Sequence, residues 1–305
     1  MARGKEITAG KKNGGKKRKK SSRLLDVLLV LLFVFGLLVL LYPTLSNMYM
    51  QYMMGKSVAS YDSQVSQMSK KDLQKEWKKV RAYNAKLAKT GINFFPSEEM
   101  HEEYEDALNP DDDTNGMMGH VQISKLGIDL PIYHGTSDDV LQVGVGHIEG
   151  TSLPGGGKST HASLSGHRGL PTSELFTNLD QLQEGDVFLL HILDKTLAYQ
   201  VDKISVVLPN ESESLQIDQG KDQCTLITCT PYGINTHRLL VRGHRVDYPD
   251  KDYIAADAVG LDPLLVATLI AIPAFIAVMV GVLASRSRKR KAAKGRGKIE
   301  ERSTS

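Results

Sequence analysis

The stretch TLITCTPYGINTHRLLVRG, residues 225–243, decides how this chain is interpreted. Its first part is an apolar run that ends at Cys229, and a second apolar run begins after Arg238. Two short apolar runs separated by turn residues are typical of paired β-strands. Free cysteines are often small buried core residues. A cysteine at a strand end that faces a cation on the next strand also fits a nucleophile, so both interpretations stay open at this point.

The sequence around this stretch is rich in short β-like runs bounded by turn residues, which favours a sandwich or a barrel. A single short helix is expected between two of the runs, at TSELFTNLDQL (172–182), with Thr172 or Ser173 as its cap. The expected strands are MGHVQIS (118–124), IDLPIYHG (128–135), VGVGHIEG (143–150), HASLSG (161–166), DVFLLHIL (186–193), LAYQVDKISVVLP (197–209), CTLITC (224–229) and LLVRGHRV (239–246).

Two apolar runs, residues 24–42 and 264–284, are each close to the roughly 20 residues that a membrane-spanning helix needs. Lys/Arg-rich segments flank both runs on the sides of the chain termini. Such flanks stay cytoplasmic, so both termini are expected inside and residues from about 45 to 260 outside the plasma membrane. A cleaved signal peptide is the alternative for the first run, although its apolar core would be unusually long. The formal net charge is only +3 and the basic residues lie at the ends, which argues against a nucleic-acid partner.

The region between the first span and the strands is polar and is expected to be a juxtamembrane helical region over residues 43–88. Apolar residues recur there at three- and four-residue spacing, which predicts a helix face packed on the following domain. Residues 89–116 are expected to be a linker or a lid. The residues of the helix face are Leu73, Trp77, Val80, Tyr83, Asn84 and Leu87.

The chain has two cysteines, Cys224 and Cys229, five positions apart on one expected strand. Their side chains should point to opposite faces, which makes a disulfide between them geometrically implausible. An exported domain with unpaired cysteines favours a reactive thiol for at least one of them.

A histidine and an arginine complete a candidate constellation with Cys229. His167, in LSGHRGLP (164–171), follows a strand directly, and an imidazole beside a thiol is a common means of activating it. Arg238 opens the returning strand, where a guanidinium can stabilise a thiolate, an oxyanion or a bound carbonyl. Arg168 and Arg242 are alternatives for this cationic role. No Cys/His cluster with zinc-ligand spacing occurs, so no metal is expected.

Together, TLITCTPYGINTHRLLVRG and LSGHRGLP resemble the sortase family, the membrane-anchored cysteine transpeptidases of Gram-positive bacteria. The resemblance covers roughly residues 117–247. Together with the second span, the strings GHVQISKLGIDLPIYHG, VGVGHIEGTSLPGGGKSTHASLSGHRGLP and TPYGINTHRLLVRG resemble class C, the pilin-polymerising branch. It implies an eight-stranded β-barrel with Cys229 as nucleophile, His167 as general acid and base, and Arg238 holding the substrate carbonyl and oxyanion.

The resemblance also implies the substrates. A C-terminal sorting signal of the type Leu-Pro-x-Thr-Gly would be cleaved between Thr and Gly through a thioester and transferred to a pilin lysine. The partners would be pilins or other surface proteins and the lipid bilayer, with no cofactor. Alternatives are a housekeeping sortase that anchors surface proteins to peptidoglycan, and a non-catalytic, membrane-tethered β-domain that binds surface proteins.

The chain departs from class C at the lid, because residues 88–112 lack the Asp-Pro-aromatic motif that is common in that branch. The candidates for a lid anchor are Phe94 and Phe95. Thr228 and Asn235 are the candidates for the substrate groove. The expected organisation is 1–23 basic cytoplasmic N-terminus, 24–42 span, 43–88 helical region, 89–116 lid or linker, 117–250 catalytic barrel, 251–263 linker, 264–284 span and 285–305 basic cytoplasmic tail.

Overall fold

The structure is a computed structural model that describes residues 18–109 and 116–247, together with Pro273, Phe275, Ala277 and Gly281. Residues 1–248 form one compact unit and residues 249–305 another. The expected second span, 264–284, lies outside the described residues except for those four, which are helical. That span therefore stays a prediction.

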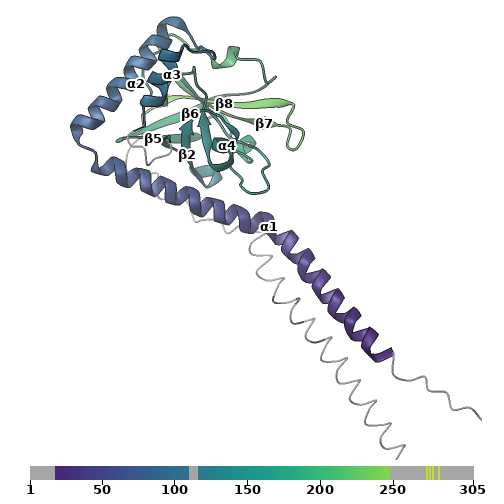
Figure 1. The fold of residues 1–305 in the computed structure, drawn as a ribbon. Coiled ribbons are helices and arrows are strands. Elements are labelled where there is room, and N and C mark those ends of the chain that lie inside the picture. The colour runs from purple at the N-terminus through teal and green to yellow at the C-terminus, as the bar shows by residue number, and fades with distance from the viewer. Residues whose placement is uncertain are drawn as a thin grey trace, which may run out of the picture. The chain divides into compact units, whose positions relative to one another are not determined.

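The expected eight-stranded barrel is confirmed: the strands form a closed barrel in the order β1-β2-β3-β4-β7-β8-β6-β5 (Figure 1). β4 pairs with β7 in parallel, and β7 pairs with β8 in antiparallel orientation. The strands are β1 (Met117–Ile123), β2 (Ile128–His134), β3 (Val145–His147), β4 (Thr160–Ser165), β5 (Val187–Ile192), β6 (Lys195–Val207), β7 (Asp222–Thr230) and β8 (His237–Val246).

The two faces of β7 pack in different places because successive side chains of a strand point to opposite sides. Cys224 and Leu226 belong to the main core inside the barrel. Ile227, on the other face, joins Leu215 and Leu240 in a small cluster on the outside. This outer cluster marks the face on which Cys229 lies.

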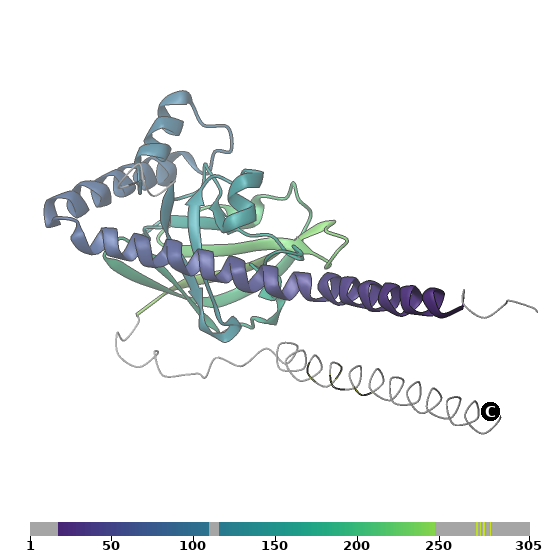
Figure 2. The ribbon, with the colours of Figure 1, turned by 60° about the horizontal axis from the view of Figure 1, so that its bottom comes forward.

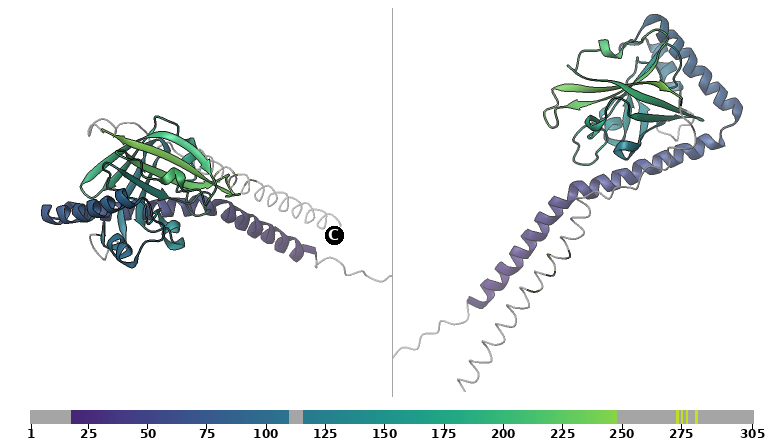
Figure 3. Two further views of the ribbon diagram at one scale, coloured as in Figure 1. Left: turned by 90° about the horizontal axis from the view of Figure 1, so that it is seen from above. Right: turned by 180° about the vertical axis from the view of Figure 1, so that it is seen from behind.

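Two long helices precede the barrel (Figures 1 and 2). α1 (Arg18–Gln67) contains the expected first span and then continues without interruption, and its later part contacts β1 and β2. Its stretch Val30–Gln67 is long and apolar enough to cross a membrane. The views in Figure 3 show the N-terminal part of α1 running on beyond the barrel.

α2 (Lys70–Thr90) begins where Ser69 caps the helix by accepting a hydrogen bond from the Asp72 amide. Its expected packing face is buried from Trp77 to Leu87, and Leu73 packs against the same core. The Trp77 indole N–H donates to Asp194 at 2.7 Å, which fixes the helix to the end of the β5–β6 turn.

Within the expected lid or linker, residues 98–106 form a helix, α3 (Glu98–Asp106). Ser97 caps this helix by accepting from the Met100 amide, and the fully buried Tyr104 docks it on the barrel. Ser97 as a cap, followed by the acidic Glu98 and Glu99 in the first turn, is a sequence signal for a helix start.

The short α-helix expected at 172–182 does not form, and the segment contains only a 3₁₀ turn, η3 (Leu179–Gln181). Leu175 has a φ of 38°, which a right-handed helix cannot accommodate. The Glu174 amide donates instead to the Asn47 side chain of α1 at 3.0 Å. A tertiary contact thus replaces the local helical bond that the sequence pattern favours. The remaining helical elements are α4 (Asp138–Val143), η2 (Ser124–Leu126) and η4 (Glu213–Leu215).

Candidate active site

The β7–β8 pairing places Cys229 directly opposite Arg238. Paired residues on neighbouring strands carry their side chains on the same face, with Cβ atoms about 4.5–5.5 Å apart. The Arg238 guanidinium donates from Nη1 to the carbonyls of His237 and Asn235, at 3.1 and 3.3 Å. Both Cys229 and Arg238 are partly exposed, so a substrate can reach them.

The β4–β7 pairing brings His167 to the other side of the same strand. Ser165 pairs with Ile227 at the end of the parallel ladder. The Gly166 amide continues that ladder by donating to the Ile227 carbonyl at 3.0 Å. His167 follows two positions after Ser165, as Cys229 follows two positions after Ile227. The three predicted residues therefore come from three adjacent strand ends, with Cys229 in the middle.

Within residues 18–109 and 116–247, no hydrogen bond joins the Cys229 thiol to the His167 imidazole. Catalytic hydrogen bonds are often long without substrate and tighten only in the substrate complex. The arrangement supplies a thiol, a titratable ring and a cation around one accessible strand end, which is the set that acyl transfer through a thioester needs.

The two cysteines have the contrasting environments that their spacing predicts, and both are free thiols. Cys224 is fully buried in the core, and burial raises the pKa of its thiol well above the ordinary value. Cys229 is partly exposed at the strand end. Cys224 is thus an inert core residue, and Cys229 is the cysteine available for chemistry.

Both alternative arginines are engaged elsewhere. Arg242 donates to Asp202 from Nε at 2.9 Å and from Nη2 at 3.3 Å. Arg168 forms an ion pair with Asp180 and donates from Nη1 to the Thr230 hydroxyl at 3.2 Å. These contacts leave Arg238 as the guanidinium that faces Cys229.

The two groove candidates differ in their positions. Thr228 is 1% exposed and lies on the inner face of β7, opposite to the face of Cys229. Its hydroxyl donates to the Gly166 carbonyl at 2.8 Å, so it supports the His167 segment and does not line a groove. The structure thus favours a supporting role for Thr228 over a place in the groove. Asn235 is exposed in the β7–β8 turn with a φ of 60° and stays a candidate.

The segment between α2 and α3 lies on the barrel without using the predicted aromatic anchors as plugs. Phe95 is 91% exposed, which contradicts an anchoring role for it in this conformation, and Phe94 is also exposed. Ile92 packs instead against the outer cluster that contains Ile227.

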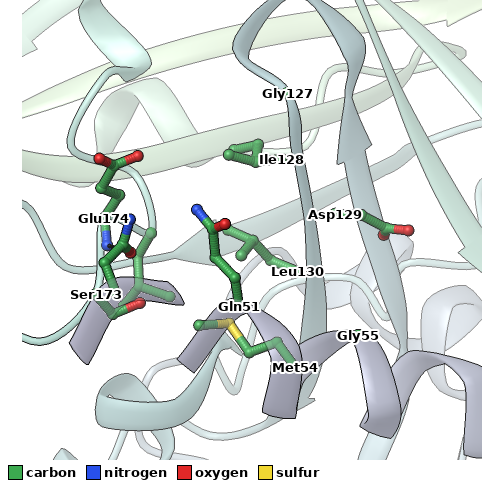
Figure 4. A pocket seen from close by; sticks show the side chains of 11 residues that line it. Gln51, Met54, Gly55, Gly127, Ile128, Asp129, Leu130, Ser173 and Glu174 are labelled. Atoms are coloured by element: carbon green, nitrogen blue, oxygen red, sulfur yellow. Dashed lines mark hydrogen bonds between the residues drawn. The ribbon is translucent and has the colours of Figure 1, made fainter. Parts of the chain in front are cut away.

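A cavity of about 210 Å³ lies away from this site, between α1, β2 and the segment around Ser173 (Figure 4). It contains none of the three predicted catalytic residues. Its lining includes Asn47, Gln51 and Met54 of α1, Ile128 and Leu130 of β2, and Ser173 to Leu175. The cavity lies where α1 packs on the barrel and is not the candidate active site.

The contacts of Arg168 with Asp180 and Thr230 were not expected from the sequence. Asp180 is one of several acidic residues in an irregular segment, and no spacing rule connects it to Arg168 or Thr230. The adjacency of Arg168 to His167, and of Thr230 to Cys229, is the only signal that the sequence offers.

Comparison with known proteins agrees with the fold. The sortase domain family matches residues 121–246. Sortase A of Bacillus anthracis is 28% identical over 134 residues, which are 44% of this chain and 62% of that protein. The chain thus spans less than two thirds of that relative.

Solved structures are more similar. The crystal structure of sortase C1 from Streptococcus agalactiae has a TM-score of 0.62 and 47% identity, covering 64% of this chain and all of that one. Streptococcus pneumoniae sortase C follows with a TM-score of 0.56 and 45% identity, covering 63% of this chain and 97% of that one. The two structures compared above are those of class C sortases, and the chain belongs to the sortase family.

Proposed function

We propose that the protein is a membrane-anchored cysteine transpeptidase that joins pilin subunits through isopeptide bonds. The observation that carries the proposal is the register that puts Cys229 between Arg238 on β8 and His167 after β4. The class comes from the sortase C structures that the chain resembles, one of which is described as bearing on pilin substrate specificity.

In the first half of the proposed reaction, the Cys229 thiolate attacks the carbonyl carbon of Thr in a Leu-Pro-x-Thr-Gly sorting signal. The tetrahedral oxyanion lies against the Arg238 guanidinium, which stabilises charge that develops only in the transition state. The carbon–nitrogen bond to Gly then breaks, and the protonated His167 gives its proton to the departing amine. The product is a thioester between Cys229 and Thr.

In the second half, the ε-amine of a pilin lysine attacks the thioester carbonyl. His167 accepts a proton from the attacking amine, and the Cys229 thiolate leaves as the amide bond forms. The energy of the original peptide bond is conserved in the thioester, so the exchange needs neither ATP nor a cofactor. This independence fits a site on the outer side of the membrane.

The proposed location is the plasma membrane, with the barrel outside and both termini in the cytoplasm. Support comes from α1, which joins an apolar stretch to the barrel as one continuous helix, and from the Lys/Arg residues at its start. The second span at 264–284 belongs to the same proposal.

The test uses the full chain in detergent micelles, a purified pilin subunit and a fluorescent sorting peptide. We expect a ladder of pilin multimers, with lysine isopeptide bonds found by mass spectrometry, and no ladder with Cys229→Ala. Peptide cleavage with transfer only to short wall-like amines would indicate the housekeeping activity instead. Absence of both peptide cleavage and transfer would favour a non-catalytic domain.

A further inference from the structure

Arg168 lies between the two strand ends that carry the proposed base and nucleophile. It follows His167 directly in the chain, and its Nη1 donates at 3.2 Å to the hydroxyl of Thr230, the residue that follows Cys229. Its Nη2 binds the Asp180 carboxylate. One guanidinium thus connects the segment after β4, the end of β7 and the 3₁₀ turn η3.

The burial of this guanidinium is unusual for a surface ion pair. The Arg168 side chain is only 9% exposed, whereas its partner Asp180 is 48% exposed. The Nε–H group is buried and has no hydrogen-bond partner among the described residues. Burying a guanidinium with one donor unpaired is costly. The buried Arg168 guanidinium is therefore not expected to raise the overall stability of the protein. Its contacts are better explained by a role in fixing the local geometry of the segment after β4.

Few hydrogen bonds of the described residues connect the segment that carries His167 to the end of β7. Residues 166–178 form no strand or α-helix. The Phe176 amide donates to the His167 carbonyl at 3.1 Å, and the Gly169 amide donates to the Thr177 hydroxyl at 3.0 Å. Both bonds lie within the segment itself. Beyond Gly166, the Arg168–Thr230 bond is the hydrogen bond that ties the segment to the end of β7 among the described residues, and the Tyr232 ring lies close to Gly169.

We propose that Arg168 is a positioning residue, which sets the distance between the His167 imidazole and the Cys229 thiol by holding Thr230 and Asp180 together. This inference rests on the proposed transpeptidase function. It differs from the role of Arg238, because the Arg168 guanidinium is buried and would not touch the substrate. A shift of about 1 Å in a reacting group can cost roughly 10²-fold in rate.

The experiment compares Arg168→Met and Arg168→Lys with Arg242→Met in the full chain in detergent. Arg242 is a matched control, because it also forms a partly buried ion pair, with Asp202, on the neighbouring strand β8. Sorting-peptide cleavage gives kcat and KM separately. Hydrogen exchange of residues 166–178 reports on the segment whether or not the enzyme is active.

For Arg168→Met we expect kcat to fall roughly 10²-fold with KM nearly unchanged, because the reacting groups are misplaced while the binding surface is kept. Lys at position 168 can reach one partner at a time and should restore part of the loss. Residues 166–178 should exchange faster in Arg168→Met, and neither change should occur in Arg242→Met.

A double-mutant cycle with Thr230→Val separates positioning from general destabilisation. If the two residues act through their hydrogen bond, Arg168→Met combined with Thr230→Val should be no slower than the slower single variant. Additive losses, or unchanged exchange of residues 166–178 in Arg168→Met, would overturn the role of Arg168. An inactive wild-type chain would overturn the transpeptidase proposal instead, and the exchange data would still decide the role of Arg168 in holding the segment.

Discussion

At the scale of single residues, the positions of Cys224 and Cys229 follow from their odd spacing on one strand. The two cysteines lie five residues apart on β7, so the Cys224 thiol points into the core and the Cys229 thiol lies on the outer face beside Arg238. The same alternation places Thr228 inside, where its hydroxyl holds the Gly166 carbonyl. A change of one residue in register would exchange these positions, so the site depends on the register of β7.

His147 should make the stability of the barrel depend on pH. Its ring is fully buried between the Tyr104 hydroxyl and the Ser152 carbonyl, and burial lowers its pKa to about 4. The unfolded chain takes up this proton near the ordinary pKa of about 6.5. The contribution of neutral His147 to the free energy of unfolding is therefore fully present above about pH 6.5. It is lost as the pH falls towards 4, by up to about 3 kcal/mol.

The measurement is urea unfolding at pH 7.5, 5.5 and 4.5, followed by the fluorescence of Trp77, the only tryptophan. His147→Gln should be less stable than wild type at pH 7.5 and show a shallower decline with falling pH. Burial lowers the pKa of His161 and His191 as well, so some decline should remain. Equal pH dependence in both proteins would refute the role of His147.

At the scale of elements, the eight strands could be predicted because each combines an apolar run with nearby turn residues. The segment 172–182 could not, since its fold depends on the contact of Glu174 with Asn47, 127 residues away. The pairing of Cys229 with Arg238 follows from a hairpin, a local feature. The approach of His167 depends on the parallel pairing of β4 with β7, which no local pattern encodes. The local sequence indicates only that His167 directly follows a strand.

Gly150 should control how the segment 91–97 lies on the barrel. Its φ is 85°, and a Cβ there would collide with the carbonyl of Asn93. The Asn93 amide also donates to the Gly150 carbonyl at 3.0 Å. Gly150→Ala should therefore detach this segment, including Ile92, and expose the outer face of β7 near Cys229. Faster proteolysis within 91–97 and faster alkylation of Cys229 are the expected results.

The control for this prediction is Gly127→Ala, because Gly127 also has a positive φ, 64°, but faces open space. Each substitution should cost about 1 kcal/mol in backbone strain. Only Gly150→Ala should also introduce a collision of the new Cβ with the Asn93 carbonyl. Equal protease sensitivity and equal alkylation rates in the two variants would show that Gly150 does not hold the segment.

At the scale of the whole unit formed by residues 1–248, α1 contains the apolar stretch and also packs against the barrel. Tyr61 on α1 is almost fully buried, and its hydroxyl donates to the Met118 carbonyl at 2.8 Å. The same hydroxyl accepts from the Leu193 amide at 2.9 Å. These bonds join the barrel, at β1 and at the end of β5, to the helix that contains the apolar stretch Val30–Gln67.

Tyr61→Phe should destabilise the barrel, because the Met118 carbonyl and the Leu193 amide would both lose a buried partner. Each buried unpaired group costs about 1–3 kcal/mol. Tyr52→Phe is the control, since Tyr52 lies on the same helix and is 70% exposed. Urea unfolding followed by Trp77 fluorescence should show a clear loss for Tyr61→Phe and little change for Tyr52→Phe. Equal urea midpoints for Tyr61→Phe and wild type would mean that the Tyr61 hydroxyl does not stabilise the packing of α1 on the barrel.

The most direct test of the account is mass spectrometry of the full chain after brief incubation with a Leu-Pro-x-Thr-Gly peptide. Wild type should carry an added mass equal to the peptide fragment ending in Thr, on Cys229, through a bond that hydroxylamine cleaves. The adduct should be absent in Cys229→Ala and strongly reduced in His167→Ala and Arg238→Ala. A wild-type chain that forms no adduct although Cys229 is readily alkylated, or an adduct that persists in Cys229→Ala, would contradict the assignment.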